Sequence, residues 1–505
     1  MDTAIRQTSI TAPAVRTLGL SWPLVVAIAA LFGSLCLLPI DRSLGDPDIY
    51  WHIVAGNWTL AHHAVPSTDI FSYSMPGAHW TRQEWLAELA MALIFRAGGW
   101  VAMVMLGAAS FALTLALLTR FLLARMEPIH ALLFVSLSAF MMLNHLLVRP
   151  HLLTWPLLAL WVGTLIDACE AERDPPWWLL IVMVLWANLH GGFTLGLVLG
   201  AGIGLDALVS APRGTRSRVA ARWLSFVAAA LAVSMLTPSG WGGIWFTVRL
   251  LRMDYAKSVL DEWRSPDFHQ LQALEIWLLL ALAMAWSGRM RLPVVRSLLL
   301  LGLVHLALAA GRSVSLLGLV SSYLLAAPMA RDWYHGSSAT GAKDAESLDR
   351  WFRAFSCRAA PGAVALTMGL AAAGLTVIVR ERAPAIAPTF TPAAAFAAAR
   401  AAGAKGPVLN AYGFGGYLIF RGVKVFIDDR ADLYGDAFLK RYIEALDLTH
   451  AADLPGLLTQ YHVGWTLLPP DTPAAYAMDQ MPGWKRVYTD TVAVVHMRKA
   501  DDAPR

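Results

Sequence analysis

Long apolar runs separated by short polar loops fill the first three quarters of the chain. Most of these runs are close to the roughly 20 residues that an α-helix needs to cross a bilayer. The pattern predicts eleven membrane-spanning helices, at 20–38, 100–119, 130–148, 152–168, 177–189, 192–209, 221–236, 271–287, 296–310, 313–330 and 361–379. The fold class expected from the pattern is therefore a polytopic α-helical membrane protein.

The composition supports this prediction. Hydrophobic residues make up 57% of the 505 residues and charged residues only 15%, whereas soluble domains carry about 25% charged residues. The net charge of +5 does not indicate nucleic-acid binding, because the arginines gather in short loops between apolar runs. Loops of this kind set the orientation of membrane helices.

The distribution of arginine predicts the orientation. Four stretches are arginine-rich, and they are 120–125, 211–218, 288–296 and 331–358. With eleven spans, all four fall on the same side as the N-terminal residues 1–19, and positively charged loops are typically cytoplasmic. We therefore expect residues 1–19 to be cytoplasmic, residues 20–380 to form the membrane domain, and residues 39–99 to form a long loop on the opposite, extracytoplasmic face.

One further apolar run, 84–97, is short and carries Glu84, Glu88 and Arg96. If it crossed the membrane, the N-terminus would lie on the opposite side from the arginine-rich loops, against the usual bias. We interpret it as a helix that lies along the outer membrane surface or dips into it.

The character of the sequence changes near residue 381. Residues 381–400 are rich in proline and alanine and read as a linker, and residues 401–505 are predicted to form a small α/β domain. Its expected strands are 407–420, 423–429, 463–470 and 487–498, and its expected helices are 436–448 and 451–461. By the number of spans this domain is predicted to be extracytoplasmic, and therefore periplasmic in a bacterium.

The first outer loop contains the most unusual chemistry. It opens with Asp46-Pro47-Asp48, directly after the first predicted span. Two carboxylates one residue apart can share a divalent cation such as Mg²⁺ or Mn²⁺, or leave one carboxylate free as a base. Asp-Pro is also a common turn, so the pattern alone leaves both interpretations open.

The order of these features resembles the C-type glycosyltransferase (GT-C) superfamily, in particular a bacterial branch of it. The sequence-level match is confined to residues 46–88, DPDIYWHIVAGNWTL…VPSTDIFSYS…QEWL, and the architecture covers the whole chain. The resemblance implies an inverting sugar transfer from a polyprenyl-phosphate donor to a glycan, lipid or protein acceptor on the outer face of the bacterial inner membrane. It makes Asp46 or Asp48 the candidate base. The WWDYG motif of oligosaccharyltransferases is not found, which argues against protein N-glycosylation.

Within this resemblance, a lipid-phosphate leaving group needs cations. Arg149 and Arg312 lie at the outer ends of predicted spans, and arginine binds phosphate in a bidentate manner. The alternative is that each side chain extends to the membrane interface, as any arginine at a helix end can. Glu262 could complete a metal site with Asp46 and Asp48, or it could be an ordinary solvated loop charge.

Four further residues are, like Glu262, candidates for substrate binding. They are His52, Glu84, Asn188 and His190. His52 lies one helical turn beyond Asp48, so the two side chains can share a helix face. A lone histidine is more often structural than functional, so a structural role is the alternative for these residues. The segment FIDDRADLYGD in the C-terminal domain could bind an acceptor glycan, close over the membrane site, or form a structural turn.

Two other classes of protein compete with a monophosphate-dependent transferase. A transporter or flippase for lipid-linked sugars tends to show internal repeats and charges in the middle of its spans, and neither is found. A polymerase or ligase that uses lipid diphosphate-linked glycans also carries outer-face arginines, but such a protein lacks an early Asp-x-Asp loop.

Overall fold

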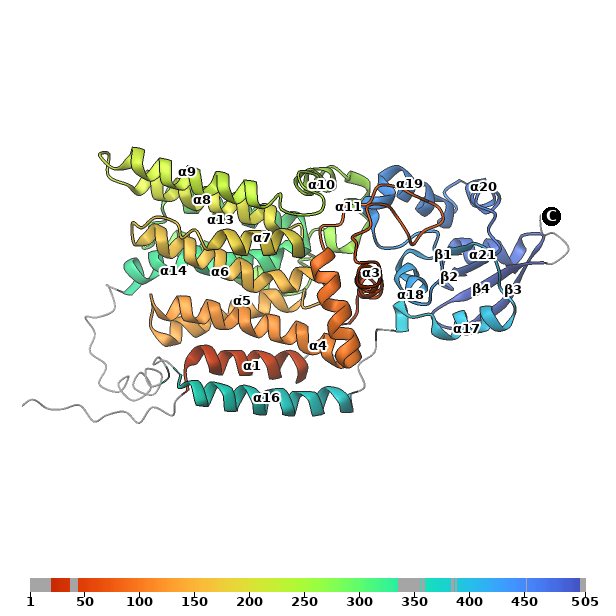
Figure 1. Cartoon of the computed structure of the whole chain (residues 1–505), viewed down its shortest axis with the longest axis horizontal. Coiled ribbons are helices and arrows are strands. Elements are labelled where there is room, and N and C mark those ends of the chain that lie inside the picture. Colours follow the sequence, from red (N-terminus) through yellow and green to blue (C-terminus); the bar gives the residue numbers. More distant parts are fainter. Residues whose placement is uncertain are drawn as a thin grey trace, which may run out of the picture.

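The structure is a computed structural model of the chain, and it describes residues 20–36, 44–334, 355, 359–382, 386, 388–450 and 452–499. The predicted cytoplasmic segment 1–19 and most of the arginine-rich stretch 331–358 lie outside the described residues. A bundle of helices occupies one side of Figure 1, and a small domain with a sheet occupies the other.

Helices form the bundle. They are α1 (Trp22–Cys36), α4 (Trp85–Leu123), α5 (Pro128–Leu143), α6 (Pro150–Glu170), α7 (Leu179–Leu189), α8 (Phe193–Ser210), α9 (Arg216–Val233), α12 (Ala273–Trp286), α13 (Val294–Ala309), α14 (Val314–Tyr334) and α16 (Pro361–Glu381). Every predicted apolar run overlaps one of these helices. Among the described residues, five helices are long and apolar enough to cross a membrane, and these are α4, α6, α8, the segment Gly311–Asp332 that contains most of α14, and α16. The chain is a membrane protein, and the number of eleven spans stays a prediction.

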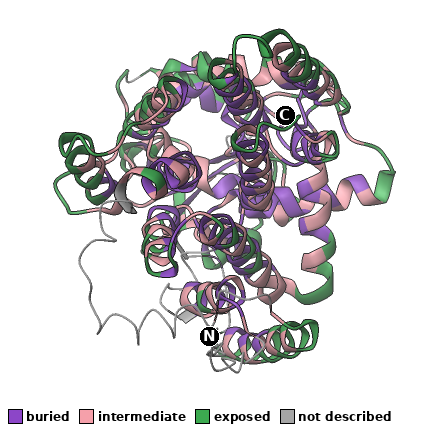
Figure 2. Cartoon of the chain, turned by 90° about the vertical axis from the view of Figure 1, so that its left-hand side faces the viewer, coloured by how far each residue is buried: buried purple, intermediate pink, exposed green. Residues whose placement is uncertain are grey.

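The outer surface of the bundle is apolar. Figure 2 looks at the bundle from its far end and shows that exposed residues lie on the outward faces of the helices. Several of them are large hydrophobic residues, such as Phe140 (61% exposed) and Trp286 (83% exposed). Surfaces of this kind are rare on soluble proteins and are suited to contact with lipid tails.

Helix α4 is bent at a pair of glycines. Gly98 has φ −155°, and Gly99 has φ 58° with ψ −147°, a backbone conformation that is available to glycine but strained for other residues. The part of α4 before this kink runs across the end of the bundle in Figure 1. The structure thus separates residues 85–97 from the following span, as expected for a surface-lying helix.

The C-terminal domain has a four-stranded sheet. Its strands are β1 (Val408–Asn410), β2 (Trp465–Leu468), β3 (Trp484–Thr489) and β4 (Val494–Arg498), in the order β1-β2-β4-β3. Strand β1 is parallel to β2, and the other two pairings are antiparallel. The helices are α17 (Ala393–Ala401), α18 (Gly415–Phe420), α19 (Ala431–Leu446), α20 (Asp453–Gln460) and α21 (Pro473–Gln480), with the 3₁₀ turn η4 (Tyr412–Phe414). The predicted α/β domain is confirmed.

Three of its four predicted strands differ in the structure. The run 407–420 is a strand only as far as Asn410, and it then turns through η4 into α18. The run 423–429 forms no strand of the sheet, because the side chain of Asn410 is hydrogen-bonded to its backbone groups. The Asn410 amide nitrogen donates to the Ile427 carbonyl at 2.8 Å, and the Asn410 amide oxygen accepts from the Phe426 N–H at 2.9 Å. The run 487–498 is a hairpin, β3 and β4, rather than one strand.

The outer loops lie between the bundle and this domain. They contain α3 (Asp48–His62), α10 (Gly242–Leu251), α11 (Asp254–Val259) and the 3₁₀ turns η1 (Asp261–Trp263), η2 (Gly311–Ser313) and η3 (Pro388–Phe390). Residues of the first loop pair with the C-terminal domain: the Tyr73 N–H donates to the Val425 carbonyl at 3.0 Å, and the Val425 N–H donates to the Phe71 carbonyl at 3.1 Å. The loop and the domain therefore form one wall.

Candidate active site

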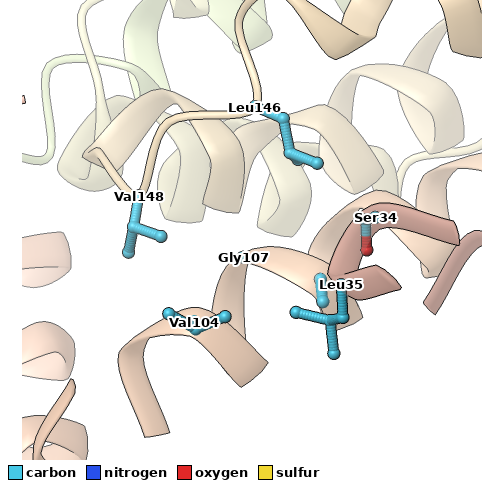
Figure 3. Close-up of a pocket in the computed structure, with 7 residues that line it drawn as sticks. Ser34, Leu35, Val104, Gly107, Leu146 and Val148 are labelled. Carbon is cyan, nitrogen blue, oxygen red and sulfur yellow. The ribbon is translucent and has the colours of Figure 1, made fainter. Parts of the chain in front are cut away.

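A cavity of about 680 Å³ lies between the end of the bundle and the C-terminal domain. The first loop, the start of α6, the loop 237–269, η2 and the C-terminal domain all contribute to its lining. A second depression, lined by residues such as Leu35, Val104 and Val148 (Figure 3), is apolar and has no room for a water molecule. The polar cavity is therefore the candidate site.

Asp46-Pro47-Asp48 forms a rigid turn at the start of α3. The Asp48 N–H donates to Asp46 Oδ1 at 2.9 Å, and proline fixes the φ of the residue between them. Arg149 donates to Asp46 Oδ2 at 3.0 Å and pairs with Asp48 Oδ2. Trp51 Nε1 donates to Asp48 Oδ1 at 2.9 Å. All four carboxylate oxygens therefore have a hydrogen-bond or ion-pair donor.

Arg149 is the centre of an acidic cluster. It precedes α6 and also donates to Glu262 Oε2 at 3.0 Å, so its guanidinium faces three carboxylates. Burial opposes its charge, but these carboxylates outweigh burial and hold its pKa well above the usual value. Burial also raises the pKa of Asp48, well above its ordinary range, although Arg149 opposes the shift. Arg149 is thus largely neutralised by the protein itself.

Arg312 is less fully paired. Its nearest carboxylate is Glu262 Oε1 at 3.5 Å, and its guanidinium stacks over Trp263 with 4.3 Å to the ring centroid. Its side chain is 32% exposed and lines the cavity. Burial opposes ionisation of Glu262, but Arg149 and Arg312 outweigh it and lower the pKa of this carboxyl to about 2. Arg312 is the cation of this cluster that is more available to a ligand.

The predicted metal site does not fit this arrangement. Asp46, Asp48 and Glu262 converge, but they converge on the guanidinium of Arg149, which lies where a shared cation would have to bind. In the part of the chain that the structure describes, no group of three or more acidic, histidine or cysteine side chains could hold a metal ion. We therefore derive no step through a metal.

Glu84 lies between two histidines, the buried His52 and the half-buried His190. Its carboxylate is 3.4 Å from His190 Nε2 and 3.7 Å from His52 Nε2. The Gly192 N–H donates to His190 Nδ1 at 3.0 Å, so neutral His190 carries its proton on Nε2, the atom that faces Glu84. Burial lowers the pKa of His190 to about 3 and raises the pKa of Glu84 to about 7. Glu84 and His190 line the cavity, whereas His52 is buried behind it.

Asn188 does not line the cavity. Its amide oxygen accepts from Trp85 Nε1 at 2.7 Å, and its amide nitrogen donates to the carbonyls of Val184 and Leu236 at 2.8 and 3.0 Å. The side chain therefore anchors the start of α4 to α7. The prediction that Asn188 contacts substrate is not supported by this position, since its hydrogen-bonding groups are occupied by protein.

The C-terminal domain is clamped to the first loop by a buried charge pair. Arg430 donates to both oxygens of Asp428, each at 2.7 Å, and forms an ion pair with Asp69 of the first loop at 2.8 Å. Tyr434 also donates to Asp428, at 2.9 Å. In the FIDDRADLYGD segment, these residues are structural. Asp429, Asp432 and Tyr412 line the cavity together with Arg430.

Close backbone packing fixes the Asp-Pro-Asp turn against the same domain. A Cβ atom on Gly416 would lie 2.3 Å from the carbonyl oxygen of Pro47, so only glycine allows this approach. On α3, the ring of Tyr50 packs against Tyr417 and Phe420 with centroids 5.6 and 5.1 Å apart. The adjacent glycines 415 and 416 can be seen in the sequence, but the contact of Gly416 with Pro47 could not be predicted from it.

Sequence reasoning missed a buried pair beside Glu84. Arg82 pairs with Glu88, and its guanidinium lies 4.4 Å from the centroid of the Trp80 ring. All three residues line the cavity. Their only signal in the sequence is their position within the first loop.

No protein-family model matches the sequence, and no curated protein matches it. Solved structures match the fold. The apo oligosaccharyltransferase of Archaeoglobus fulgidus aligns with a TM-score of 0.56 at 11% identity, over 95% of this chain and 74% of that one. AglB from the same organism, in complex with an inhibitory peptide and a dolichol-phosphate, aligns over the same shares with a TM-score of 0.53 at 12% identity.

A third structure, ArnT from Cupriavidus metallidurans bound to undecaprenyl phosphate, aligns with a TM-score of 0.48 at 12% identity, over 96% of this chain and 98% of that one. The fold assignment rests on the two archaeal structures. They confirm that the chain has the fold of the GT-C superfamily, as the resemblance implied. At this level of identity the likeness concerns the fold, and the roles of individual residues stay predictions.

Proposed function

We propose that this protein is a membrane glycosyltransferase that moves a sugar from a polyprenyl-phosphate donor to a hydroxyl-bearing glycan, lipid or protein acceptor. The observation that carries the proposal is the convergence of three carboxylates and two arginines, from four separate segments, in one cavity at the end of a GT-C bundle. The neighbours with this fold include a protein solved with a dolichol-phosphate.

The chemistry is a single displacement with inversion at the anomeric carbon. The acceptor hydroxyl gives its proton to a carboxylate of the site, and its oxygen attacks the anomeric carbon. The bond between that carbon and the phosphate oxygen breaks, and the polyprenyl phosphate leaves with the electron pair. Of the two arginines, Arg312 has fewer contacts with carboxylates of the protein. We therefore assign it to the phosphate of the donor, because charge-assisted hydrogen bonds are strong. Arg149 holds Asp46, Asp48 and Glu262 in place.

The proposed location is the bacterial inner membrane, with the N-terminus in the cytoplasm and the C-terminal domain in the periplasm. The turn between α8 and α9, with Arg213, Arg216 and Arg218, lies at the end of the bundle away from the cavity, and so does the end of α14 (Figure 1). Arginine-rich ends are typically cytoplasmic, which supports the proposal that the cavity opens at the outer face.

The experiment is transfer in membrane vesicles that contain the full-length protein. Radiolabelled sugars are supplied on undecaprenyl phosphate and, separately, on undecaprenyl diphosphate. Labelling of an acceptor from the monophosphate donors is the expected result. Labelling from the diphosphate donors alone would favour a polymerase or ligase, and passage of the intact donor across the membrane without labelling would favour a flippase.

A further inference from the structure

Of the two acids in the Asp428-Asp429-Arg430 triplet, Asp429 is the one with a carboxylate oxygen, Oδ2, that lacks a hydrogen-bond partner in the described part of the chain. Its backbone carbonyl accepts from the Tyr412 hydroxyl and from the Ala431 N–H, each at 3.0 Å. Its neighbours on both sides form the clamp to the first loop. The position of Asp429 is therefore fixed through its main chain, while its carboxylate lines the cavity.

The hydrogen bonding of the Asp429 carboxylate is incomplete. Asp429 Oδ2 is buried, and within the described residues it has no hydrogen-bond partner. A buried oxygen without a donor is destabilising, so such a group in a native structure calls for an explanation such as a catalytic role, a bound ligand or an ordered water. This oxygen is available to a group that enters the cavity.

The two aspartates of the first loop, Asp46 and Asp48, differ from Asp429 in their hydrogen bonding. Asp46 and Asp48 have donors on all four oxygens, and Arg149 holds one oxygen of each. A general base must come within hydrogen-bond distance of the proton that it removes. To do so, either aspartate would have to give up or share a contact that the protein supplies.

We propose that Asp429 is the general base of the transfer, and that the C-terminal domain thereby supplies part of the active site. The inference rests on the proposed glycosyl transfer. The acceptor hydroxyl binds on the wall formed by the C-terminal domain and passes its proton to Asp429. Its oxygen forms the new bond to the anomeric carbon as the bond from that carbon to the lipid phosphate breaks.

The electrostatics of the wall agree with this role. Burial raises the pKa of Asp429 well above its usual value, and the nearby charges of Asp48, Asp46 and Asp428 add to the shift against the opposing charge of Arg149. A carboxylate with a raised pKa is a stronger base, and general bases work best when their pKa approaches the working pH. On the same wall, burial raises the pKa of Asp432 to about 6.

The test compares Asp429→Asn with Asp471→Asn in full-length protein. Asp471 is an exposed acid of the same domain, so it controls for the chemistry of the substitution. Initial rates are measured at saturating undecaprenyl-phosphate sugar as a function of pH, and donor binding is measured by the thermal shift that undecaprenyl phosphate produces. Asp429→Glu tests whether a displaced carboxylate restores part of the rate.

We expect Asp429→Asn to lower kcat by roughly 10²- to 10⁴-fold, the range for loss of a general base. Donor binding and melting temperature should stay within the range of the control, and Asp429→Glu should recover activity with a shifted pH profile. If Asp429→Asn keeps a rate within threefold of wild type, the assignment is wrong while the transfer reaction stands. If wild-type protein transfers no sugar from any monophosphate donor, the proposed function itself fails, and the inference fails with it.

Discussion

Substitution of Gly416 by alanine tests whether the C-terminal domain positions the Asp-Pro-Asp turn. The new Cβ would lie 2.3 Å from the Pro47 carbonyl oxygen, whereas a close carbon–oxygen contact is about 3.3 Å. The backbones of α18 and the turn must therefore separate by about 1 Å. Because Pro47 lies between Asp46 and Asp48, that movement displaces both carboxylates relative to Arg149.

The structure sets the expected size of the effect. Overpacking of a tight site typically costs about 1–3 kcal/mol of stability, and a displacement of about 1 Å at an active site can cost roughly 10²-fold in rate. We expect Gly416→Ala to fold with a lower melting temperature and to lose transfer activity by roughly that factor.

Gly456→Ala is the matched control. Gly456 lies in α20 of the same domain, and no atom lies within 4 Å of its added Cβ. Alanine in a helix is more favourable than glycine by about 0.5–1 kcal/mol, so this variant should be as stable as wild type or more so, with normal activity. Thermal unfolding in detergent and initial transfer rates measure both. Normal activity in Gly416→Ala would refute the idea that this contact sets the geometry of the turn.

Three further predictions follow from single contacts. Arg312→Gln should raise KM for the donor about 10- to 100-fold, as expected for loss of a charged hydrogen bond worth about 1.5–3 kcal/mol, with little change in melting temperature; an unchanged KM would contradict its assignment to the phosphate. Because burial raises the pKa of Glu84 from 4.5 to about 7, the folded state binds the extra proton, and its stability should fall as the pH rises from 5 to 8, by at most about 3 kcal/mol. Glu84→Gln should remove that part of the pH dependence of thermal unfolding, and identical pH curves for the two proteins would contradict it. Because Arg149 fills the space between the three carboxylates, transfer should persist in EDTA; loss of activity that Mn²⁺ or Mg²⁺ restores would show that the carboxylates bind a metal in the working enzyme.

The sequence was informative where one physical rule dominated. The length and apolar character of the runs predicted the bundle helices, since hydrocarbon demands about 20 apolar residues per span. The short charged run 84–97 could be recognised as different for the same reason. Strands of the C-terminal domain were less predictable, because the side chain of Asn410 takes the backbone groups of 426–427 that a ladder would need.

Several residues of the candidate site could be predicted from the sequence, but the contacts between them could not. Asp46, Asp48, Arg149, Glu262 and Arg312 were all expected at one face, and the structure brings them together. Their mutual pairing could not be foreseen, because it depends on distances between segments that lie from 50 to 113 residues apart in the sequence.

The C-terminal domain illustrates the same limit. The acids of FIDDR look alike in the sequence, and only their partners separate the clamp residue Asp428 from the unoccupied carboxylate of Asp429. Likewise, Asn188 looks like a cavity residue until its contact with Trp85 is seen.

The central claim is sugar transfer from a lipid monophosphate. The most direct measurement is the labelling of acceptors in vesicles that contain the wild-type protein, with the same sugars supplied on undecaprenyl phosphate and on undecaprenyl diphosphate. We expect labelling from at least one monophosphate donor, and none from the diphosphates. Labelling that depends on the diphosphate donors, with none from any monophosphate, would contradict it.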